Sequence, residues 1–148
     1  MTKREERLAR LAKANQCIQI ISEHGRRFFS LRADSYPDKC MADRVSRFEL
    51  DEKTGKLWFR DKYSWKRVYV AYPYKWRGFS EGGTLRSLIQ SLRDWINDES
   101  KTVPFGHFGP WQEWVCGGDL WGYGKEEMAE VRRRVIALFH DEDWSKVA

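Results

Sequence analysis

Cysteine is scarce in this chain, with Cys17, Cys40 and Cys116 the only three among 148 residues and no C-x-x-C pair. An odd and low count argues against the disulfide framework of small secreted proteins, and the spacing argues against a structural zinc site. No apolar run approaches the roughly 20 residues that span a bilayer. The charged start has no apolar block behind it, so we expect no secretory signal and a cytoplasmic protein.

Motifs of cofactor-dependent enzymes are also missing. The sequence contains no dinucleotide fingerprint, no P-loop, no kinase motif set and no G-x-S-x-G string. We therefore expect neither a cofactor nor a metal. Nor does the sequence show a low-complexity tract or an internal repeat.

What is present is typical of a globular protein, with 41% hydrophobic and 33% charged residues. The length is that of one domain, so we expect residues 1–148 to share a single core. Apolar residues at helical spacing predict three helices, over residues 1–24, 84–98 and 125–140. Thr84 is the expected N-cap of the central helix.

Residues 26–72 carry the pattern of an antiparallel sheet. Candidate strands separated by short connections cover Arg27–Leu31, Arg44–Leu50, Lys56–Asp61 and Trp65–Tyr72. Alternation places six apolar side chains on the core face: Phe48, Leu50, Leu57, Phe59, Val68 and Val70. The central helix is expected to lie across that face.

Residues 101–124 form the longest irregular segment and hold six of the eleven glycines and three of the eight tryptophans. We expect an ordered, packed loop rich in glycine and aromatic residues. The predicted fold class is therefore α+β: a three- or four-stranded antiparallel meander sheet with N-terminal, central and C-terminal helices.

Charge is distributed unevenly, at +5 over residues 1–33, +2 over 34–100 and −2 over 101–148. A basic N-terminal half is compatible with a polyanionic partner. The best candidate site is the start of the central helix, where bare backbone amides and the helix dipole favour an anion and basic and aromatic side chains cluster. Its predicted residues are Lys75, Trp76, Arg77, Gly82, Gly83, Thr84 and Arg86. The alternative is an ordinary capped helix with Trp76 packed in the core.

A second candidate is the polar face of the sheet, where arginines alternate with aromatic side chains. This pattern is similar to a stacking platform for single-stranded nucleic acid. The predicted members are Arg47, Trp58, Arg60, Trp65, Arg67 and Tyr69. The alternative is that cross-strand pairs of these residues only stabilise the sheet.

Catalytic patterns are weaker. Cys116 and His107 lie near each other in sequence and suggest a nucleophile and its base, although a small buried thiol is the simpler interpretation. The carboxylates of Asp61, Glu113 and Asp119 are candidates for acid–base chemistry, but sequence alone places no two of them together.

Several strings resemble a family of small proteins encoded in tailed-phage and prophage genomes. They are HGRRFF at residues 24–29, FRDKYS at 59–64, WRGFSEGGTLR at 76–86 and GDLWGY at 118–123. The resemblance covers roughly residues 15–140. It implies a phage setting, with the host cytoplasm as the compartment, and assigns no binding or catalytic residue.

We therefore expect a non-enzymatic phage accessory protein that binds an anionic partner, either a nucleic acid or a nucleotide. One alternative is an inhibitor that contacts a host enzyme or defence complex through residues 104–124. Another is a small enzyme acting on phosphorylated substrates. The sequence leaves the oligomeric state open.

Overall fold

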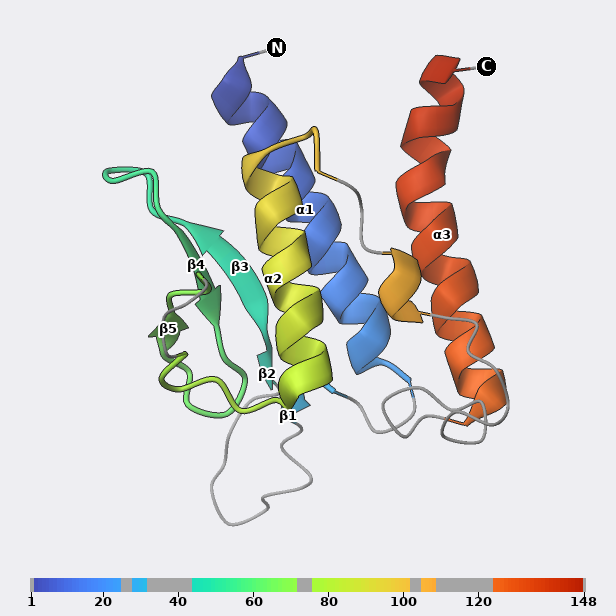
Figure 1. The fold of residues 1–148 in the computed structure, drawn as a ribbon, viewed down its shortest axis with the longest axis horizontal. Coiled ribbons are helices and arrows are strands. Elements are labelled where there is room, and N and C mark those ends of the chain that lie inside the picture. Colours follow the sequence, from blue (N-terminus) through green and yellow to red (C-terminus); the bar gives the residue numbers. More distant parts are fainter. Residues whose placement is uncertain are drawn as a thin grey trace.

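The computed structural model describes residues 2–24, 28–31, 44–71, 76–101, 105–108 and 124–147, without the side chains of 105, 106 and 141–147. Within this part of the chain, three α-helices accompany two small antiparallel sheets (Figure 1), which confirms the predicted α+β class. The elements in chain order are α1 (Lys3–Ser22), β1 (Ser30–Leu31), β2 (Arg44–Val45), β3 (Arg47–Leu50), β4 (Leu57–Arg60), β5 (Arg67–Val68), α2 (Gly83–Asn97), η3 (Phe105–Phe108) and α3 (Lys125–Val147).

Helix α1 lies at the centre of the fold, in contact with α2, α3 and β3. Its N-cap is Thr2, whose hydroxyl oxygen accepts from the Glu5 amide at 3.1 Å, and Glu5 and Glu6 suit the positive end of the helix dipole. Because several elements surround α1, its second half is buried on more than one side: Ala14, Cys17, Ile18, Ile20 and Ile21 are at most 8% exposed.

The predicted strands form two sheets instead of one. Strands β3, β4 and β5 make the expected antiparallel meander, whereas β1 pairs separately with β2. The predicted strand Arg44–Leu50 is interrupted at Ser46. This buried residue donates its backbone N–H to the Phe29 carbonyl and accepts the Lys62 amide on its hydroxyl.

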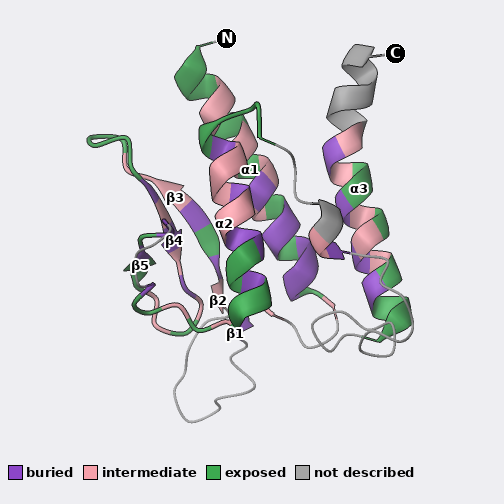
Figure 2. Cartoon of the chain, in the orientation of Figure 1, coloured by how far each residue is buried: buried purple, intermediate pink, exposed green. Residues whose placement is uncertain are grey.

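The β3–β4–β5 sheet lies beside α2 and α1 (Figure 1), and the side chains of its apolar face share one buried cluster with those of the two helices. Its predicted members Phe48, Leu57, Phe59, Val68 and Val70 are all buried, and Leu50 is half-buried. Figure 2 shows the buried positions on the facing sides of the helices and the sheet. The predicted core face of the sheet is confirmed.

Helix α2 presents the predicted apolar stripe, and every one of its members but Trp95 is buried: Leu85, Leu88, Ile89, Leu92 and Ile96. Its predicted N-cap is wrong. Gly82 is the N-cap and makes no side-chain capping bond, while Thr84 is an exposed residue of the first turn. Helix α3 continues to Val147, beyond the predicted end at residue 140, and its buried stripe consists of Met128, Val131, Val135 and Phe139.

Asn15 fastens α1 to the open edge of the sheet. Its amide oxygen accepts the backbone N–H of Phe48 at 2.6 Å, and its amide nitrogen donates to the Phe48 carbonyl at 3.1 Å. The side chain thus makes the pair of bonds that a further strand would make. The outer edge of β3 is therefore satisfied at Phe48 by a side chain of a helix.

Asp61 joins the β4–β5 turn to the segment that leads into α2. One of its carboxylate oxygens accepts the Tyr63 and Ser64 amides at 2.9 and 3.1 Å. The other accepts the amide and the hydroxyl of Ser80, both at 2.9 Å. The side chain is fully buried, so these four bonds replace the water that the carboxylate gave up.

Glu81 connects the same region to the chain before β1. Its side chain is 3% exposed, pairs with the Lys62 ammonium at 2.5 Å and accepts the Phe29 amide at 3.1 Å. Phe29 has a left-handed backbone (φ 66°), so Glu81 helps to hold a strained residue. Parts of three of the family-like strings therefore meet around Asp61 and Glu81.

We predict that Asp61→Ala lowers the free energy of unfolding by about 3 kcal/mol, because it leaves several buried donors without an acceptor. Urea denaturation measures the loss. Asp51→Ala is the matched control, since Asp51 accepts the corresponding amides of Lys53 and Thr54 in an exposed turn. A loss no larger for Asp61 than for Asp51 would contradict the role given to Asp61.

Candidate functional site

The polar face of the β3–β4–β5 sheet carries a line of three arginines. Arg47 pairs with Arg60 across β3 and β4, and Arg60 pairs with Arg67 across β4 and β5. We call these three residues the arginine row. Like charges directly opposite each other destabilise a sheet, so the row is not explained by sheet stability alone.

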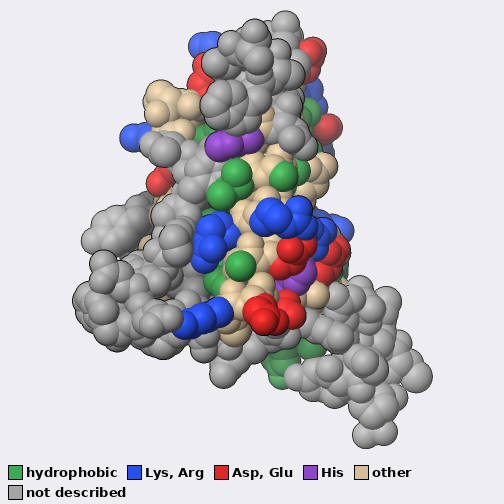
Figure 3. Space-filling view, turned by 90° about the vertical axis from the view of Figure 1, so that its right-hand side faces the viewer, with side chains coloured by type: hydrophobic (Ala, Val, Ile, Leu, Met, Phe, Trp, Pro, Cys, Tyr) green, Lys and Arg blue, Asp and Glu red, His purple; other side chains and the backbone are tan. Residues whose placement is uncertain are grey.

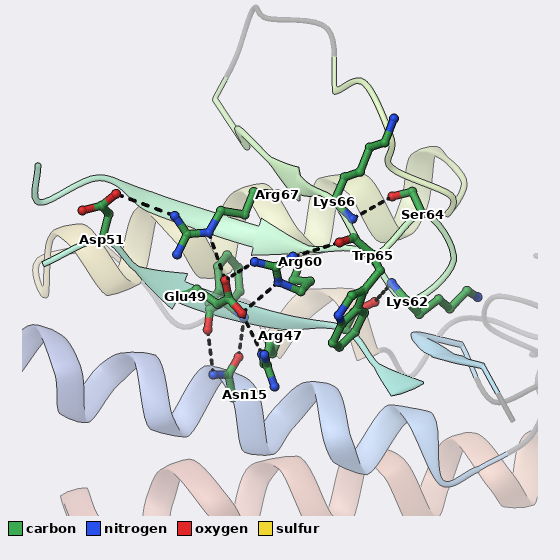
Figure 4. A network of polar contacts seen from close by, with 12 residues as sticks. Asn15, Arg47, Glu49, Asp51, Arg60, Lys62, Ser64, Trp65, Lys66 and Arg67 are labelled. Carbon is green, nitrogen blue, oxygen red and sulfur yellow. Dashed lines mark hydrogen bonds and ion pairs between the residues drawn. The ribbon is translucent and has the colours of Figure 1, made fainter. Parts of the chain in front are cut away.

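Glu49 holds the arginine row together (Figure 4). Its two carboxylate oxygens accept hydrogen bonds of 2.9–3.1 Å from all three arginines. Burial alone would raise the pKa of Glu49, but the hydrogen bonds from Arg60, Arg47 and Arg67 outweigh it and lower the pKa from 4.5 to about 2. The carboxylate is therefore ionised at neutral pH.

Three guanidinium groups from neighbouring strands lie near the Trp65 ring. Those of Arg44, Arg47 and Arg60 lie 5.2, 5.3 and 5.6 Å from the centre of its ring. Arg60 also donates to the Trp65 carbonyl at 2.8 Å. With Arg67 included, the region holds four guanidinium groups and only two carboxylates, those of Glu49 and Asp51, so it keeps a positive charge.

The backbone of Trp65 is left-handed, with φ of 53°, which is rare for a bulky residue. The β3–β4 turn is built in the same way. In each turn an Asp carboxylate accepts two amides and a backbone N–H four residues later bonds to the carbonyl of that Asp: Gly55 to Asp51 and Trp65 to Asp61. The left-handed position of the first turn is filled by Gly55, φ 74°, which adopts it without strain.

The two turns share this geometry although their sequences, DEKTGK at residues 51–56 and DKYSWK at 61–66, are identical only at the first Asp and the last Lys. Where Gly suffices in the first turn, the second carries Trp65 at a strain of roughly 1–2 kcal/mol. Strain of this kind persists where the surrounding structure holds the residue in place, and strained residues are frequent at functional sites. The Trp65 ring is therefore a strong candidate for a functional group.

A pocket of about 550 Å³ opens beside Trp65, between α1 and the strands β2 and β3. Its lining includes Gln19, Arg44, Arg47 and Trp65. Further along the polar face, Trp58 and Tyr69 lie 5.6 Å apart between ring centres, and the Lys56 ammonium lies over Tyr69. The predicted members of the polar face are thus brought together on one surface.

The residues predicted at the start of α2 come together less completely. Trp76 is buried, packs edge-on against Phe79 and has the Arg86 guanidinium 4.8 Å from its ring centre, so it offers no open ring to a base. Gly82 and Gly83 are exposed, with open space where a side chain would stand, and Arg77 is exposed. Lys75 lies outside the described residues. Anion binding by these amides stays a prediction.

The catalytic candidates find little support among the described residues. Cys17 is fully buried, and burial raises the pKa of its thiol to about 12. Burial also lowers the pKa of His107, whose ring nitrogen lies 3.3 Å from the Ser91 hydroxyl. Three predicted residues lie outside the described part: Glu113, Cys116 and Asp119.

Two further absences concern only the part of the chain that the structure describes. No cluster of three or more His, Cys, Asp or Glu side chains there is arranged to hold a metal ion. No helix there is long and apolar enough to cross a membrane.

A family model matches residues 4–143, almost the whole chain, and its description is YoqU. The chain belongs to the YoqU family. No curated protein and no solved structure matches it significantly. The chemistry assigned to this YoqU protein must therefore come from its own residues.

Sequence reasoning missed Glu49, Arg44 and Asn15. The pattern that predicted the polar face consisted of basic and aromatic side chains only, and therefore did not include Glu49. The alternation of Arg47, Glu49 and Asp51 on one strand face was the signal that would have revealed it. The exceptional place of Trp65, where the other turn has Gly55, emerges only from the shared turn geometry.

We predict that Glu49→Gln removes up to about 3 kcal/mol of stability at pH 7 and flattens the acid side of the pH–stability curve. A depressed pKa stabilises the fold above the unfolded value near 4.5, and this contribution disappears as the pH falls toward 2. Denaturant unfolding across this pH range measures it. Glu52→Gln, in a largely exposed pair with Arg4, should follow the native curve. Equal curves for Glu49→Gln and the native protein would contradict the assignment.

Proposed function

We propose that this protein binds single-stranded nucleic acid across the polar face of the β3–β4–β5 sheet, without catalysing a reaction. The observation that carries the proposal is the arginine row: three guanidinium groups aligned on adjacent strands and held by one carboxylate. Phosphate groups are the natural counter-ions of such an array, because guanidinium binds phosphate in a fork of two hydrogen bonds.

The extent of the face favours a chain over a single nucleotide. Successive rows of side chains on the polar face begin at Lys56, continue through Trp58 and Tyr69 to the arginine row, and end at Trp65. Rows on one face of a sheet are about 6.6 Å apart, so four rows extend over roughly 20 Å. That length suits several nucleotides.

Aromatic side chains favour a single strand over a duplex. The Tyr69 side chain is 36% exposed and lies beside the Trp58 ring. Unpaired bases can stack on such rings, with roughly 1–3 kcal/mol per base, whereas paired bases are already stacked on each other. The side chains of this face thus combine phosphate binding with stacking.

The setting that we propose for this binding is the cytoplasm of a phage host. It rests on the resemblance of the motif strings to tailed-phage proteins.

We predict that a labelled oligonucleotide binds with an affinity that falls steeply as salt is added, and that Arg47→Ala/Arg67→Ala weakens binding about tenfold or more. The double variant should also lower the slope of log K against log salt by about 0.7 for each lost phosphate contact. Fluorescence anisotropy measures both quantities for single strands and for duplexes of the same sequence.

Arg133→Ala is the matched control, because Arg133 is an exposed arginine paired with Glu130 on α3. This helix lies on the side of the molecule away from the sheet (Figure 1), and its outer face mixes basic and acidic side chains (Figure 3). Binding by the Arg133 variant should match the native protein. Tighter binding of the duplex, or an unchanged affinity of the double variant, would overturn the proposal.

We predict that Trp65→Gly abolishes binding while changing the free energy of unfolding by no more than about 1 kcal/mol, because glycine suits the left-handed backbone. Gly55→Ala, in the equivalent turn, is the opposite case: it should lower stability by about 1 kcal/mol and leave binding intact. Thermal unfolding and anisotropy on both variants separate the two roles. Full binding by Trp65→Gly would show that the ring is dispensable.

A further inference from the structure

The arginine row ends on β3, beside α1. From β5 through β4 to β3 it runs across the sheet, and beyond β3 it meets α1, which Asn15 fastens to the strand edge. The pocket beside Trp65 lies at this meeting point (Figure 4). The side-chain rows of the polar face that begin at Lys56 also end at Trp65, so a nucleic-acid strand bound along this face reaches the pocket, with α1 beside it.

Two guanidinium groups face the pocket with donors to spare. Arg47 uses its Nε on Glu49, which leaves both Nη groups available. The guanidinium group of Arg44 lies over the ring of Trp65, and no carboxylate of the described residues pairs with it. None of the described residues that line the pocket is acidic.

We propose that this pocket holds a terminal phosphate, so that the protein recognises the phosphorylated end of a single strand. The inference rests on the proposed function. A terminal phosphate carries a charge of about −1.5 to −2 at pH 7, whereas an internal phosphate diester carries one negative charge, and two guanidinium groups that line one pocket favour the more highly charged group. The pocket volume, about 550 Å³, is within the range that accommodates a small ligand, so the terminal nucleotide can enter with its phosphate.

The test compares four forms of one oligonucleotide: 5′-phosphorylated, 3′-phosphorylated, hydroxyl-ended and circular. We expect one phosphorylated form to bind about tenfold more tightly than the hydroxyl-ended form, with the circle no tighter than the latter. Which phosphorylated form binds best assigns the polarity of the strand. The preference should fade as the pH falls below about 6, where the terminal phosphate gains a proton.

Arg44→Ala and Arg67→Ala form a matched pair of variants. Arg44→Ala should bring the affinity ratio of phosphorylated to hydroxyl-ended strands close to one. Arg67→Ala, at the far end of the row, should weaken every form and preserve the ratio. Equal binding of circular and phosphorylated linear strands would overturn this inference and leave the proposed function standing. A failure of all four forms to bind would overturn both.

Discussion

The carboxylate of Glu49, shared by three guanidinium groups, is the interaction on which the polar face depends. Without it, three like charges would oppose one another across adjacent strands, and repulsion would separate the side chains or the strands. With it, the arginines are aligned and retain donors for a further anion. One half-buried acid thus makes a basic surface compatible with a stable sheet.

Hydrogen bonds of Asp61 and Glu81 support the turn that carries Trp65. Asp61 and Glu81 tie the β4–β5 turn to the segments before β1 and before α2, and each of them satisfies backbone amides that would otherwise be buried without partners. The turn therefore holds Trp65 in its strained conformation at a fixed place beside Arg44 and Arg47. Preorganisation of this kind lowers the entropy that binding must overcome.

Sequence patterns predicted the helices and the core face of the sheet well, because both depend on the periodicity of apolar side chains. The α2 stripe and the alternation around Phe59 are examples. Two features depend on particular hydrogen bonds and were not predictable in this way: the break of the strand at Ser46 and the cap of α2 at Gly82. For the site, residue types indicated the polar face, but its central acid and the strain at Trp65 emerge only from strand register and backbone angles.

The central position of α1 has a consequence for biosynthesis. This helix leaves the ribosome before α3, yet its buried residues pack against α3, more than 100 positions later in the chain. Until α3 is translated, the apolar flanks of α1 have no complete set of neighbours. Non-local packing of this kind slows folding and prolongs the exposure of hydrophobic surface. Nascent chains need chaperones most while such surface is exposed.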